Sequence, residues 1–85
     1  MNLYESQKTI KTKEDFTFFL ELLLNDYKQN NDDWENKTLI NFLEALHAYS
    51  NDLEGFYSNN DITFDKNNPS WKNFAQILLG AKVYE

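Results

Sequence analysis

Apolar side chains recur at helical spacing in three segments of the chain, and each segment follows a residue that commonly caps helices. The segments are residues 13–29 after Thr12, residues 39–58 after Thr38 and residues 69–84 after Asn68. In each segment the apolar positions fill an arc of at least about 140° at 100° per residue. The pattern predicts an all-α fold, a compact three-helix domain that spans residues 1–85.

The third helix is expected to pack across the other two, because its apolar arc is the widest, at roughly 200°. The first helix is apolar on a second side as well, where Phe18 and Leu22 lie opposite its main arc. We expect an ordered N-terminal segment, with Leu3, Tyr4 and Ile10, to cover these two residues. The alternative is that Phe18 and Leu22 form the seam of a homodimer.

The start of the third helix is predicted from Asn68 and Pro69. Asn is a preferred N-cap, and Pro suits the first helical position, where its missing N–H needs no partner. Trp71 lies in the first turn within the apolar arc, so we expect it in the core. Lys82 projects into the same arc near the helix end. Its ammonium group either reaches solvent along the last turn, which we favour, or pairs with a carboxylate at the edge of the core.

Two loops rich in Asn and Asp, residues 30–37 and 59–67, connect the predicted helices. In the first loop, Trp34 stands among acidic residues. It either plugs the gap between the first two helices, which we favour, or forms an exposed anchor for a partner. In the second loop, polar and apolar residues alternate, so a short extended piece is expected to direct Ile62 and Phe64 inward.

Composition narrows the class of partner. The chain has 14 acidic residues against eight basic ones and a net charge of −6, so nucleic acid is repelled at long range. The absence of cysteine removes disulfides and thiolate metal sites. The apolar runs are too short for a membrane span, and the first ten residues lack a signal-peptide pattern. We therefore expect a cytoplasmic protein with no nucleic-acid partner and no membrane association.

Few residues have catalytic or metal-binding potential. His47 is the only histidine, and no nucleophile or soft metal ligand accompanies it in a recognised motif. Oxygen-bearing residues alternate from Asp61 to Asn67 as in a calcium-binding loop. Lys66, however, replaces the glycine and Lys72 replaces the final glutamate that such a loop needs. We predict no enzyme activity, no cofactor and no metal site.

Two stretches carry a resemblance to a known family. One is Asn68-Pro69-Ser70-Trp71 with the apolar helix that closes on Tyr84-Glu85, and the other is the Trp34-Glu35-Asn36 turn before Thr38. Over about residues 14–85 the chain resembles a family of small uncharacterised bacterial proteins, a domain of unknown function. The resemblance implies a free-standing bacterial cytoplasmic domain. It assigns no activity and no functional residue.

These features favour a non-catalytic role in protein–protein interaction. The acidic charge speeds encounter with a basic partner, as in an adaptor or an immunity-like inhibitor. The candidate partner-binding residues are Asp32, Asp33, Trp34, Glu35, Asp61 and Asp65. Two alternatives remain open: a homodimeric structural protein that uses Phe18 and Leu22, and a small-molecule-binding or enzymatic domain with a pocket near His47.

Overall fold

The computed structural model describes residues 2–84, which form four α-helices and two short 3₁₀ turns, with no strand among them. The elements are α1 (Leu3–Ser6), η1 (Gln7–Thr9), α2 (Lys13–Asn30), η2 (Asn31–Asp33), α3 (Leu39–Asn59) and α4 (Trp71–Val83). The all-α prediction is confirmed. The long helices α2, α3 and α4 are the three that apolar periodicity predicts.

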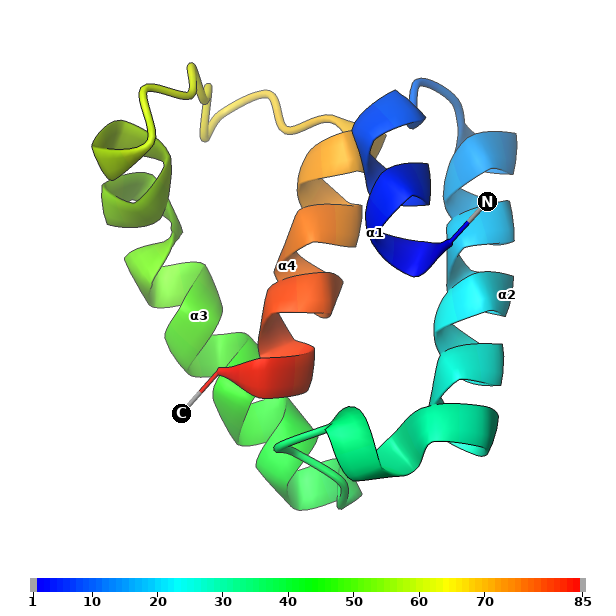
Figure 1. Ribbon diagram of the computed structural model, residues 1–85. Helices are drawn as coiled ribbons and strands as arrows, with labels where there is room; N and C mark the ends of the chain where they lie inside the picture. Colours follow the sequence, from blue (N-terminus) through cyan, green and yellow to red (C-terminus); the bar gives the residue numbers. More distant parts are fainter. Residues whose placement is uncertain (1, 85) are drawn as a thin grey trace.

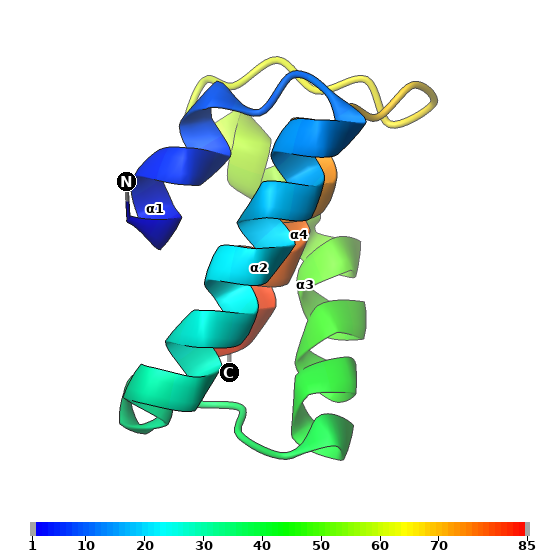
Figure 2. The same ribbon diagram turned by 90° about the vertical axis from the view of Figure 1, so that its right-hand side faces the viewer.

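The last helix, α4, is the central element of the fold. It lies between α2 and α3 and packs against both, as Figure 1 shows. Seen from the side of α2, the short helix α1 and the long helix α3 lie on opposite sides of the α2–α4 pair (Figure 2). The expectation that the third main helix packs across the other two is confirmed.

Local capping explains where α2 and α3 begin. Thr12 Oγ1 accepts a hydrogen bond from the Asp15 N–H, and the Asp15 carboxylate accepts one from the Thr12 N–H, which completes a capping box. At the start of α3, Thr38 Oγ1 accepts from the Asn41 N–H. Because these signals are local, the bounds predicted for both helices agree with the structure to within one residue.

The predicted start of α4 is wrong. Ser70 is the N-cap in place of Asn68, so α4 begins at Trp71 and Pro69 stands outside the helix. Ser70 Oγ accepts from the Asn73 N–H, and Asn73 Oδ1 accepts from the Ser70 N–H. This reciprocal box satisfies two N–H groups at once, whereas an asparagine cap at position 68 satisfies one.

A pair of alanine substitutions tests this cap. We expect Ser70→Ala to lower the free energy of unfolding by about 1 kcal/mol, the usual cost of losing a side-chain cap. Asn68→Ala, the matched control two residues earlier, is expected to change it by less than about 0.5 kcal/mol. Urea denaturation monitored by circular dichroism measures both. A larger loss for Asn68→Ala than for Ser70→Ala would contradict the assignment.

The N-terminal segment is ordered against α2 and α4, as expected. Leu3 and Ile10 are buried in one core cluster with Phe19 of α2 and Ala75 of α4. Leu22 also packs against this cluster. The segment therefore covers one of the two residues on the second side of α2.

The expectation that the segment also covers Phe18 is wrong. Phe18 remains 49% exposed. It lies about 40° farther round α2 from the core than Leu22 does, so the segment only borders it, with Ser6 and Thr9 beside the Phe18 side chain.

The end of α4 is held by residues 34–36. The N–H groups of Glu35 and Asn36 donate to the Lys82 carbonyl, at 3.1 and 3.3 Å. The Asn36 amide Nδ2 donates to the carbonyls of Ala81 and Tyr84, at 2.9 and 2.8 Å. These bonds satisfy carbonyls that a helix C-terminus otherwise leaves without partners. The turn after α2 is thereby fastened to the last turn of α4.

The connection between α3 and α4 only partly follows the expected inward alternation. Asp61 takes a left-handed conformation, with φ at 55°, and the next N–H, that of Ile62, bonds back to the Tyr57 carbonyl. Phe64 packs inward, with its ring centroid 4.7 Å from that of Tyr57. Ile62 stays exposed, so the prediction is right for Phe64 and wrong for Ile62.

Candidate protein-interaction site

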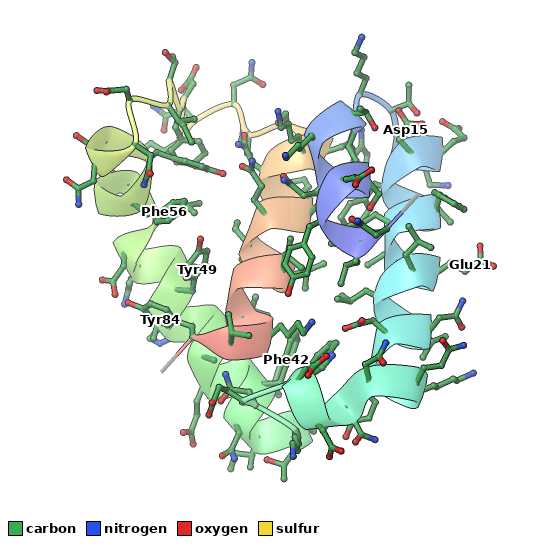
Figure 3. The ribbon with its side chains drawn as sticks, in the orientation of Figure 1. Asp15, Glu21, Phe42, Tyr49, Phe56 and Tyr84 are labelled. Carbon is green, nitrogen blue, oxygen red and sulfur yellow. The ribbon has the colours of Figure 1, made fainter. Side chains whose placement is uncertain are left out.

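An apolar hollow of about 430 Å³ lies between α2 and α3. Leu20, Leu24 and Tyr27 line it from α2, and Leu39 and Phe42 line it from α3. Figure 3 shows Phe42 on the inner side of α3, near the end of α4. Hydrophobic periodicity placed these residues on the inner arcs of their helices, but the two helices do not close over one another.

Large apolar side chains in this hollow and on helical turns near it face solvent. Seven of them are between 38% and 74% exposed, and they come from α2, α3 and the first turns of α4. We call these residues the groove face: Leu20, Leu24, Leu39, Ile40, Leu43, Trp71 and Phe74. Leu20, Leu24 and Leu39 line the hollow, and the other four lie on neighbouring turns of α3 or beside Phe16 at the start of α4. An exposed single leucine needs no explanation, but seven large exposed apolar side chains on three packed helices mark a surface that meets another molecule.

The aromatic residues at the start of α4 continue the groove face beyond the hollow. The Phe16 ring centroid lies 5.4 Å from that of Trp71 and 6.4 Å from that of Phe74. Phe16 stands one helical turn before Leu20, which lines the hollow. The expectation that Trp71 lies in the core is wrong, because Trp71 stays 38% exposed beside the Phe16 ring.

A buried ion pair lies at the end of the hollow, where Trp34 closes it. Lys82 Nζ is 2.9 Å from Asp26 Oδ2, and the Lys82 residue is only 3% exposed. The same carboxylate oxygen accepts the indole N–H of Trp34 at 2.8 Å, and Lys82 Nζ donates to the Tyr4 hydroxyl at 3.1 Å. The favoured interpretation of Lys82 as a solvent-reaching side chain is wrong, and the alternative of a carboxylate partner is confirmed.

The surroundings of the pair keep both groups charged. Burial alone raises the pKa of Asp26, but hydrogen bonds from Lys82 and Trp34 outweigh it and hold that pKa below its ordinary value. Burial alone lowers the pKa of Lys82, but its bonds to Asp26 and Tyr4 hold that pKa above its ordinary value. The stabilisation is therefore lost only as pH falls through the lowered pKa of Asp26 or rises through the raised pKa of Lys82.

Comparison with known families decides where the chain belongs. The sequence profile of a family of unknown function, DUF7660, matches residues 12–85. The chain belongs to this family. No curated protein and no solved structure matches it.

The DUF7660 match begins at the cap of α2 and includes every residue of the groove face. It also includes Asp26 and Lys82, as well as the turn at residues 34–36 that fastens the end of α4. The segment before Thr12, which supplies Leu3 and Ile10 to the core, lies outside the match. The hollow and the ion pair are thus both built on the DUF7660 part of the chain.

The structure separates the six predicted partner-binding residues of this DUF7660 chain. Residues 32–35 lie at one end of the molecule and the loop that carries Asp61 and Asp65 lies at the other, as the two ends of Figure 1 show. Asp32, Asp33 and Glu35 are exposed, whereas Trp34 is 6% exposed and plugs the gap between α2 and α3. The candidate acids therefore form two separate groups, and the Trp34 ring is not part of the solvent-facing surface.

The sequence alone does not reveal the groove face as a site, although most of its residues lie on the predicted apolar arcs. His47 is exposed on α3 and does not line the hollow. Among residues 2–84, no three histidine or acidic side chains gather as a metal site requires. Over the same residues, no helix has the length and apolar character needed to cross a membrane.

Proposed function

We propose that this DUF7660 domain is a non-catalytic module that binds another protein through the groove face. The observation that carries the proposal is the set of seven exposed apolar side chains in the hollow and on helical turns near it. Aromatic and large apolar residues at the centre of an interface supply most binding free energy once water is excluded from them. A rigid scaffold of three packed helices presents them without a large ordering cost.

The charge of the chain supports an adaptor or an immunity-like inhibitor that meets a basic protein. Exposed acids at both ends of the molecule, such as Asp32 and Asp65, contribute to the net charge of −6. A field of that sign raises the rate of encounter with a positively charged partner. A cysteine-free chain suits a reducing compartment, so the proposal places the domain in the bacterial cytoplasm.

Site-specific photocrosslinking in the source cells tests the proposal. We expect Leu43→p-benzoylphenylalanine, which places the crosslinker on the groove face, to yield a protein adduct after irradiation. Asn25→p-benzoylphenylalanine is the control, because Asn25 is exposed on α2 outside the groove face. We expect the control to yield little adduct. Equal yields at positions 43 and 25, or no adduct at position 43, would contradict the proposal.

A further inference from the structure

We propose that the groove face binds a second copy of this chain, so that the domain is a symmetric dimer. The inference rests on the proposed function and narrows it: the groove face takes a second copy, and the exposed acids at the two ends of the molecule remain the surface that attracts a basic protein. Three properties of the face support it: its area, its shape and the sign of the charges along its rim.

The area of the groove face matches one side of a stable interface. With about 200 Å² for a fully exposed aromatic side chain and less for Leu or Ile, the exposed fractions of the seven residues correspond to at most roughly 700 Å². The largest apolar patch on a typical monomer is about 300–600 Å². A standard interface buries about 800 Å² per partner, and homodimer interfaces are the more apolar kind. The groove face is therefore large enough to sustain a dimer.

The shape of the face allows it to pair with itself. A twofold interface needs one surface that carries both a projection and a matching recess. The first turns of α3 form the projection, where Ile40 and Leu43 are each more than half exposed. The recess is the neighbouring hollow, lined by Leu20 and Leu24. In a symmetric pair, the projection of each copy enters the recess of the other, so the contact forms twice.

The rim of the groove face carries both signs of charge. On α2, Glu21 and Lys28 lie three and four residues from Leu24, on the same exposed side of the helix. Before α3, Lys37 lines the hollow and lies 3.8 Å from the exposed Asp32 carboxylate of the same chain, and Glu44 follows Ile40 by one turn. A uniformly acidic rim would select a basic partner. A mixed rim instead lets two identical faces meet, since lysines of one copy can lie opposite carboxylates of the other.

Sedimentation equilibrium of the purified chain tests the dimer. We expect a concentration-dependent mass that approaches twice the 10.1 kDa of one chain. Leu43→Lys, which puts a charge on the groove face, is expected to remain at the mass of one chain. Phe18→Lys is the matched control: Phe18 is 49% exposed and Leu43 is 51% exposed, but Phe18 lies outside the groove face. We expect Phe18→Lys to dimerise as the unchanged chain does.

Each other outcome overturns the inference. A single-chain mass at all concentrations excludes the dimer, and a dimeric Leu43→Lys excludes this face. A monomeric Phe18→Lys beside a dimeric Leu43→Lys assigns the dimer to the second side of α2 instead. Circular dichroism and a cooperative thermal transition verify that both variants are folded.

If the chain is monomeric but position 43 still crosslinks to a different protein, only the proposed dimer is excluded and the proposed function stands. If position 43 gives no adduct of any kind, the proposed function fails.

Discussion

Replacement of Asp26 by alanine is expected to lower the free energy of unfolding by about 3–5 kcal/mol, the usual cost of removing one partner of a buried ion pair. The loss is large because Lys82 remains at a buried position, where its ammonium group keeps only the Tyr4 hydroxyl and two nearby aromatic rings. The indole N–H of Trp34 also loses its acceptor. Urea denaturation at a fixed protein concentration measures the change.

A second variant separates the ion pair from the packing around it. Asp26→Ala combined with Lys82→Met removes both charges and retains most of the lysine volume, so we expect it to recover most of the lost stability. In Lys82→Met alone, Asp26 is partly exposed and keeps the Trp34 hydrogen bond. We therefore expect this variant to lower the free energy of unfolding by less than Asp26→Ala does. A loss below about 1 kcal/mol for Asp26→Ala would mean that the pair behaves as a surface ion pair.

Trp34→Ala is expected to lower the free energy of unfolding by about 3–5 kcal/mol, the range for removal of a buried large aromatic side chain. The Trp34 ring packs between Tyr27 and Phe42, with centroid distances of 5.0 and 5.9 Å, and it covers the ion pair. Its loss opens a cavity between α2 and α3 next to a buried charge. Far-UV circular dichroism follows the unfolding, since the substitution removes one of the two tryptophans.

Trp71→Ala is the matched control, because Trp71 is 38% exposed where Trp34 is 6% exposed. We expect Trp71→Ala to cost about 1–2 kcal/mol. The same substitution should weaken self-association, since Trp71 belongs to the groove face. A cost for Trp71→Ala as large as that for Trp34→Ala would show that the groove face is closed over in the folded chain.

The helices of this chain are more predictable from the sequence than the contacts around them. The starts of α2 and α3 depend on Thr12 and Thr38, and each capping residue is adjacent to the pattern it begins. The start of α4 is ambiguous in the sequence, because Asn68 and Ser70 are both residue types that cap helices and lie only two positions apart. Only the bond between Ser70 and Asn73 decides between them.

The candidate site was less predictable, because its features depend on contacts between distant residues. Lys82 finds its partner in Asp26, which no local pattern connects to it. Periodicity showed that Leu24 and Phe74 lie on apolar arcs, but it did not show whether another element covers those arcs. In the same way, the sequence placed Asp32 and Asp61 in loops without indicating that the two loops lie at opposite ends of the molecule.

The fold leaves the groove face open, and we propose that two copies of the chain bind one another through it. An isotope-filtered NOESY experiment on an equal mixture of labelled and unlabelled chains detects this contact. We expect intermolecular contacts at the methyl groups of Leu24, Leu39 and Leu43. Intermolecular contacts confined to the side of Phe18, or intramolecular contacts that bury all three leucines within one chain, would contradict it.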